Sequence, residues 1–346
     1  MEPRIEYARA SDGVTIAYTT SGSGPPMIWL PPVPFSNVLA QWQIPLLRAA
    51  YDGLGRHLRV VLYDGRGTGQ SQREVEDLGL EAMIRDLEAV VSSARLGRFA
   101  LFGYYHSCLL AIAFAAAHPR QVTRLVLFGG AARGWDAMAP AETQALLTLI
   151  ERDWDLFTDA AAHAWLGWSA GETGRLMAEA FRTATTPAMA RSMLRIARDT
   201  DVSRDLGRIR VPALVIHRQG ERQIPVDVSR ELAAALPNGT LVELPGSTAT
   251  LFVEDLEGDI RVLVDFLTDG ESQPRRSPKH RASDDLTLRE VDVLRLVAGG
   301  ETNAEVAHRL GLSVHTVERH LANLYPKIGA RGRADATAYA IRRGIV

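Results

Sequence analysis

Cysteine is almost absent from this sequence of 346 residues, in which Cys108 is the only one. A single cysteine excludes any disulfide within the chain, which fits a reducing cytoplasm. No apolar run reaches the ~20 residues that a membrane-spanning helix needs. The first residues also lack the basic and apolar regions of a secretory signal. We therefore expect a cytoplasmic protein with no membrane contact, and we expect neither a cofactor nor a bound metal.

Large apolar side chains are missing from one internal stretch. Residues 268–285 contain no Val, Ile, Leu, Phe, Tyr or Trp. Such a segment cannot bury an apolar face, so it predicts a flexible linker. It separates a large domain, residues 1–267, from a small one, residues 286–346. Because 46% of the whole chain is hydrophobic, two packed domains of these sizes are reasonable.

Excess charge of either sign is small, since the net charge is −2. It is unevenly distributed, because residues 286–346 hold nine Lys/Arg against six Asp/Glu, and residues 268–285 hold four of each. The remaining −5 therefore lies in residues 1–267. A basic last domain is compatible with binding to a polyanion. An excess of this size is also within the ordinary variation of charge among domains of this length.

Short apolar runs alternate with segments of helical period in the large domain. The predicted strands are residues 27–30, 60–63, 100–103, 125–128 and 213–217, and the predicted helices include residues 80–95, 107–118 and 226–236. This alternation predicts an α/β fold with a mostly parallel sheet covered by helices on both faces. Residues 133–205 interrupt it with helical period alone, which predicts a lid inserted between two strands. Four tryptophans in the lid favour an apolar cavity beneath it.

The large domain resembles the α/β-hydrolase fold. Residues 64–71 match the pattern D-x-R-G-x-G-x-S after a strand, and residues 211–217 resemble the strand before the catalytic acid. The resemblance implies a nucleophile at the centre of G-x-S-x-G, on a strained turn between strand and helix. Here residues 103–107 place Tyr105 at that centre. A phenol with a pKa near ~10 is a poor nucleophile at neutral pH.

The other positions that the resemblance implies also depart from a working hydrolase. The acid position falls on Glu221, which can serve, but the base position falls on Ala249, and no other histidine follows before the linker. Residues 31–35 contain three prolines where the fold supplies an oxyanion donor, and proline has no amide hydrogen. We therefore predict that the triad positions Tyr105, Glu221 and Ala249 are degenerate and that the protein is not an enzyme.

We predict that the cavity remains as a binding site for a small, mostly apolar ligand. The candidate ligand-binding residues are Phe35, Tyr105, His106, Trp135, Trp154 and Trp165. His106 could instead be a structural histidine, Ser107 is expected to pack under the helix that follows, and Cys108 is expected to be core. Two alternatives stay open: an enzyme with unusual chemistry around Tyr105, His106 and Glu221, and a dimerisation domain that binds no ligand.

The small domain is predicted to be all-helical. Thr287 with Glu290 and Thr302 with Glu305 form the spacing of a capping box, and glycines follow the first two helices. Residues 301–327 predict a helix, a tight turn and a second helix that begins near Val314. The first helix presents Ala304, Val306, Ala307 and Leu310 on an apolar face.

Residues 286–346 closely resemble the LuxR-type helix-turn-helix, through residues 286–294, 303–310, 313–320 and 327–329. The resemblance implies a transcription regulator that binds double-stranded DNA as a homodimer through residues 314–327. The candidate DNA-binding residues are His315, Thr316, Glu318, Arg319, His320, Asn323 and Lys327. Two positions depart from the family. Glu318 stands where the family usually has Lys, and Pro326 stands where the family commonly has Arg or Lys. A helical bundle that binds only protein is the alternative.

Overall fold

The structure is a computed structural model. It describes residues 3–342 except for residues 168–169, 222, 269–287, 311–313, 329 and 331. It divides into two compact units, Met1–Glu271 and Ser272–Val346. Apart from Thr268, the predicted linker lies outside the described residues. The division between the two units falls between residues 271 and 272.

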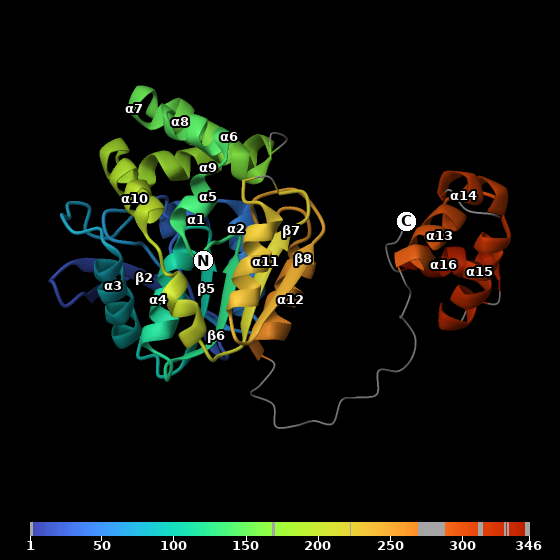
Figure 1. The fold of residues 1–346 in the computed structure, drawn as a ribbon, viewed down its shortest axis with the longest axis horizontal. Coiled ribbons are helices and arrows are strands. Elements are labelled where there is room, and N and C mark those ends of the chain that lie inside the picture. The colour runs from blue at the N-terminus through green and yellow to red at the C-terminus, as the bar shows by residue number, and fades with distance from the viewer. Residues whose placement is uncertain are drawn as a thin grey trace. The chain divides into compact units, whose positions relative to one another are not determined.

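The large unit is built on a sheet that has eight strands within the described residues, in the order β1-β2-β4-β3-β5-β6-β7-β8 (Figure 1). The strands are β1 (Glu6–Arg9), β2 (Thr15–Ser21), β3 (Pro26–Trp29), β4 (Arg59–Tyr63), β5 (Phe99–Tyr104), β6 (Val122–Phe128), β7 (Ala213–Arg218) and β8 (Gly239–Leu244). β2 pairs antiparallel with β1 and β4, and the other neighbours are parallel. The five predicted strands are confirmed as β3 to β7.

Helices cover both faces of this sheet (Figure 1). They are α1 (Val38–Trp42), α2 (Pro45–Gly55), α3 (Leu80–Ser93), α4 (Ser107–Ala117), α11 (Val226–Ala235) and α12 (Leu256–Thr268). α3 packs beside α4, and α2 packs beside α12. Every residue of α4 from Ser107 to Ala116 is buried, because the sheet covers one side and α3 and neighbouring segments cover the others. The predicted helices at 80–95, 107–118 and 226–236 are confirmed as α3, α4 and α11.

The lid is inserted in the sequence between β6 and β7, as predicted, and it lies above one end of the sheet (Figure 1). It consists of α5 (Gly134–Met138), α6 (Ala141–Leu147), α7 (Leu149–Arg152), α8 (Trp154–Leu166), α9 (Gly171–Ala184) and α10 (Pro187–Asp199), followed by the 3-10 helix η1 (Ser203–Arg208). α8 begins where the Asp153 carboxylate accepts from the Leu156 amide, and α10 begins at the Thr186 cap with Pro187 in its first turn. No helix among the described residues is both long and apolar enough to cross a bilayer.

The small unit contains α13 (Leu288–Ala298), α14 (Asn303–Leu310), α15 (Val314–Ile328) and α16 (Arg333–Arg342). Its core is formed by Val293, Leu294, Val297, Val306, Ala307, Val317, Leu321, Leu324, Ala336 and Ala340. The capping box at Thr302 is confirmed, since its amide donates to Glu305 at 2.7 Å and its hydroxyl accepts from the Glu305 amide at 3.3 Å. The prediction that Ala304 belongs to the buried apolar face of this helix is wrong, because Ala304 is exposed. Thr287 lies outside the described residues.

Candidate functional site

A strained turn after β5 carries Tyr105. The φ angle of Tyr105 is +50°, a conformation that costs energy for a residue with a side chain. The turn is held because the Tyr105 amide donates to Phe128 O at 2.9 Å and the Cys108 amide donates to Tyr105 O at 3.0 Å. Close packing leaves no room beside it, since a Cβ on Gly130 would lie 2.2 Å from Cys108 Sγ. The backbone therefore keeps the geometry that presents a nucleophile in a hydrolase of this fold. The side chain at this position is the phenol of Tyr105.

The hydroxyl of Tyr105 is buried and has no hydrogen-bond partner among the described residues. Burial, followed by the charge of Glu221, raises the pKa of Tyr105 well above its usual value. The phenol therefore stays protonated at neutral pH. It can donate a hydrogen bond, but it cannot supply the phenolate that an acyl-transfer reaction would need.

Ser107 and Cys108 are structural. Ser107 Oγ accepts from the Tyr104 amide at 2.8 Å and donates to Tyr104 O at 2.9 Å, so its proton is committed to the turn. Cys108 is fully buried, and burial raises the pKa of its thiol. Neither side chain is placed or ionised as a nucleophile, as the sequence predicts.

The acid position is kept and the base position is lost. Glu221 lies at the end of β7, where its carboxylate accepts from the backbone amides of Gln223 and Ile224. Ala249 lies in the loop after β8 and is 2% exposed, with its carbonyl oxygen bound by the Tyr104 hydroxyl at 2.8 Å. Among the described residues, no histidine is recorded in a hydrogen bond with the Tyr105 hydroxyl. The proton acceptor that a hydroxyl nucleophile requires is therefore missing from this turn.

The loop of residues 31–35, after β3, carries the three prolines that lack an amide hydrogen. Two of its residues keep an amide hydrogen, Val33 and Phe35. The Phe35 amide donates within the loop, to Pro32 O at 2.8 Å. Val33 lines the cavity beneath the lid. The loop therefore forms one wall of the cavity in which a ligand would lie.

A cavity of about 130 Å³ lies between this loop, the Tyr105 turn and the lid. We call it the lid cavity, and it is lined by Val33, Pro34, Phe35, Tyr105, His106, Ala137, Thr143, Leu146, Leu147, Phe157, Ala161, Ala164, Trp165, Leu194 and Gln223. Trp165 stacks on Tyr105 with ring centroids 5.7 Å apart, and Phe35 stacks on Phe181 at 4.1 Å. The predicted combination of Phe35, Tyr105, His106 and Trp165 is thus brought together around one apolar space.

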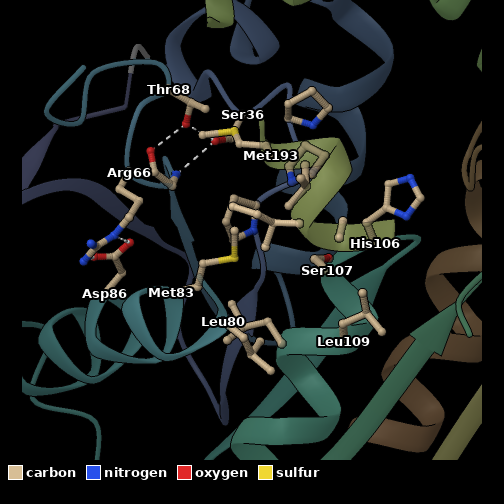
Figure 2. Close-up of a pocket in the computed structure, with 18 of the residues that line it drawn as sticks. Ser36, Arg66, Thr68, Leu80, Met83, Asp86, His106, Ser107, Leu109 and Met193 are labelled. Atoms are coloured by element: carbon tan, nitrogen blue, oxygen red, sulfur yellow. Dashed lines mark hydrogen bonds and ion pairs between the residues drawn. The ribbon is translucent and has the colours of Figure 1, made fainter. Parts of the chain in front are cut away.

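His106 lies between the lid cavity and a second, smaller cavity of about 40 Å³. Figure 2 shows the smaller cavity, with His106 on the side opposite Arg66 and Asp86. The imidazole Nδ1 is shielded from solvent without a hydrogen-bond partner among the described residues. Burial lowers the pKa of His106 to about 4, so the ring is neutral at physiological pH. The side chain of His106 thus lines both cavities.

The two remaining predicted lid tryptophans do not line the lid cavity. Trp154 stands behind Phe35, with ring centroids 6.4 Å apart, and supports that wall. Trp135 is 50% exposed on α5, so the structure places it away from the cavity that the sequence assigned to it. The helical period of the lid could not show which side of a five-residue helix faces inward. Gln223 and Phe157 line the cavity and were missed; the position of Gln223 after β7 was the available signal.

In the small unit, α14 and α15 form the predicted helix-turn-helix, and α15 begins at Val314 as expected. Val317, Leu321 and Leu324 are buried on its inner side. Glu318 is exposed, while Thr316, His320 and Lys327 are partly exposed. Positions 316, 320, 323 and 327 recur at helical spacing, so they share one face of α15. The side chains of His315, Arg319 and Asn323 lie outside the described residues, and α15 continues through Pro326 to Ile328.

Comparison with known proteins agrees with both units. Residues 36–256 match the alpha/beta hydrolase fold family, and residues 284–340 match the luxR family of bacterial regulatory proteins. The chain is 30% identical over 193 residues to "Putative carbamate hydrolase RutD" of Caulobacter sp. (strain K31), which covers 53% of this chain and 70% of that protein. It is 25% identical over 260 residues to AB hydrolase superfamily protein YisY of Bacillus subtilis (strain 168), covering 72% and 94%.

A solved structure gives the same fold. The esterase from Exiguobacterium antarcticum superposes with a TM-score of 0.67 at 18% identity, covering 76% of this chain and 98% of the esterase. At this identity the likeness concerns the fold alone. The hydrolase-fold match contains β4 to β8, the Tyr105 turn and the lid, and the luxR match contains α13 to α15 and most of α16. The chain therefore belongs to the alpha/beta hydrolase fold family and carries a luxR-family helix-turn-helix domain after it.

Proposed function

We propose that this protein is a DNA-binding transcription regulator whose hydrolase-fold domain recognises a small, mostly apolar ligand without hydrolysing it. The observation that carries the proposal is the state of Tyr105. Its backbone forms a strained turn, its hydroxyl is buried without a partner among the described residues, and Ala249 occupies the position of the catalytic base. A buried donor without an acceptor is costly, so such a group is expected where a ligand supplies the acceptor.

The DNA-binding half of the proposal rests on the luxR-family domain. Helix-turn-helix domains usually act in pairs on half-sites about one helical turn of DNA apart, so we propose a homodimer. Ligand binding would act by favouring one arrangement of the paired domains over another. The protein would work in the cytoplasm, where its DNA target lies.

The test combines ligand capture with DNA binding. Native mass spectrometry of the purified full chain should reveal a co-purifying small molecule, and its removal should change the affinity for the operator. Ala161→Leu should weaken that response, because Ala161 lines the lid cavity and is buried. Ala160→Leu is the matched control, since Ala160 is on the same helix and does not line the cavity. An unchanged DNA response in Ala161→Leu would contradict the proposal.

The alternative of a working enzyme has its own readout. The retained Glu221 carboxylate is the feature that favours it. Ester, lactone and epoxide panels should give no turnover above buffer with the wild-type protein. Turnover that disappears in Tyr105→Phe would overturn the sensor proposal. Catalysis would then depend on the phenol itself.

A further inference from the structure

The lid cavity has no ionised lining among the described residues. Of its fifteen lining side chains none is Asp, Glu, Lys or Arg, and the two titratable ones are Tyr105 and His106. Burial keeps both neutral near pH 7, because it raises the pKa of the phenol and lowers the pKa of the imidazole to about 4. A charged ligand would lose its hydration here and gain no counter-charge, which is strongly unfavourable.

One polar group of the cavity, the Tyr105 hydroxyl, requires a hydrogen-bond acceptor. The Tyr105 hydroxyl is a donor with no partner among the described residues. The Phe35 amide of the facing loop is already used within that loop. Gln223 is held by donating its side-chain amide to Ala164 O at 2.8 Å. A ligand oxygen placed against Tyr105 would satisfy the orphan donor.

The size and walls of the cavity limit the rest of the molecule. Its volume is about 130 Å³, close to the roughly 150 Å³ apolar cavity that is known to hold benzene. Three of its walls are the rings of Phe35, Phe157 and Trp165, which pack well against a flat or compact apolar group. A long acyl chain would not fit this volume without movement of the lid.

We infer that the lid cavity takes an uncharged carbonyl compound about the size of one six-membered ring, with its carbonyl oxygen accepting from the Tyr105 hydroxyl. This inference rests on the proposed function and names its ligand class. The nearby Tyr104 provides an internal reference, because its hydroxyl is committed to Ala249 O at 2.8 Å and Tyr104 does not line the cavity.

Three probes of similar size separate the requirements, measured by calorimetry on the full chain. Acetophenone has the ring and a neutral carbonyl, ethylbenzene lacks the acceptor, and benzoate carries a charge. We expect acetophenone to bind about 10-fold more tightly than ethylbenzene, which is the effect of one hydrogen bond, and benzoate to bind more weakly than acetophenone. Tyr105→Phe should remove the preference for acetophenone and leave ethylbenzene unchanged, whereas Tyr104→Phe should keep the preference.

Equal binding of acetophenone and ethylbenzene, tightest binding of benzoate, or a preference that survives Tyr105→Phe would each overturn the inference. Failure of all three probes to bind would also overturn it, because the volume and lining would then be wrong for this class. These outcomes leave the proposed function intact if a different co-purifying molecule still changes DNA affinity. The proposed function fails separately, when DNA affinity responds to no molecule that the large domain binds.

Discussion

The Tyr104 hydroxyl donates a hydrogen bond to the Ala249 carbonyl oxygen at 2.8 Å. Tyr104 ends β5, directly before the strained turn, and Ala249 occupies the position from which a hydrolase of this fold would supply its base. Both residues are buried. The loop after β8 is therefore fastened to the turn by a neutral bond to its backbone, with no imidazole in the space between them. The contact stabilises the domain and moves no proton.

Removing this bond should cost stability. Tyr104→Phe leaves the buried Ala249 carbonyl without its donor, so we expect the free energy of unfolding of the large domain to fall by about 1–2 kcal/mol. Urea unfolding monitored by tryptophan fluorescence measures the change. Tyr7→Phe is the control, because Tyr7 is 58% exposed and surface substitutions usually change stability by less than ~0.5 kcal/mol. Equal effects of the two variants would show that the bond is unimportant.

Hydrolysis should be recoverable by restoring the two lost groups. The turn already has the backbone of a nucleophile elbow, and Glu221 is already held at the acid position. We therefore expect Tyr105→Ser combined with Ala249→His to hydrolyse p-nitrophenyl acetate at least ~10-fold faster than either single variant, because nucleophile and base act as a unit. Release of p-nitrophenol measures the rate.

Adding Glu221→Gln to the double variant should lower that rate again, since the acid orients the imidazole. Circular dichroism checks that each variant is folded. A double variant that is folded and no faster than its parents would mean that more than two groups have been lost. In that case the remaining deficiency would point to the proline-rich loop of residues 31–35.

Stability should decline in mild acid because of His106. In the unfolded chain its pKa is near the ordinary 6.5, whereas in the folded protein burial lowers it to about 4. Above pH 6.5 both states are neutral at this site. As pH falls from 6.5 towards 4 the unfolded state binds a proton that the folded state does not, so stability falls, by on the order of 2–3 kcal/mol.

Comparison with His106→Gln isolates this effect. Urea unfolding at several pH values between 7.5 and 4.5 should show a shallower loss in the variant. Asp64, whose pKa is raised by burial to about 6, shifts stability in the opposite direction, but it does so in both proteins and cancels. Parallel pH profiles for the two proteins would contradict a depressed pKa at His106.

DNA affinity should depend steeply on salt if α15 contacts phosphates. Between ~50 and ~200 mM salt we expect a loss of about 10³-fold for a protein that neutralises some six phosphates. Lys327→Ala should weaken binding and reduce the slope of log affinity against log salt by about 1. Arg208→Ala, which removes the same charge from an exposed site in the large domain, should leave the slope unchanged. An affinity that barely responds to salt would exclude phosphate contacts.

Much of the fold could be predicted from local patterns. The buried strands β3 to β7 read as short apolar runs because helices cover both of their faces, and the amphipathic α3 and α11 kept their helical period. The Thr302 and Glu305 capping box appears as expected, since it depends on residues only three apart. The position of Tyr105 was also predictable, because a strand and a helix fix the register of the turn on both sides.

The sequence alone determined which side chains occupy the positions that the hydrolase resemblance assigns to nucleophile and base, namely a phenol at residue 105 and an alanine at residue 249. Only the tertiary structure decided what surrounds them. It buried the Tyr105 hydroxyl with no acceptor among the described residues, placed Val33 and Gln223 in the lining of the same cavity and turned Trp135 outward to solvent. These outcomes depend on packing between segments that are far apart in the sequence, and no local period or motif records such contacts.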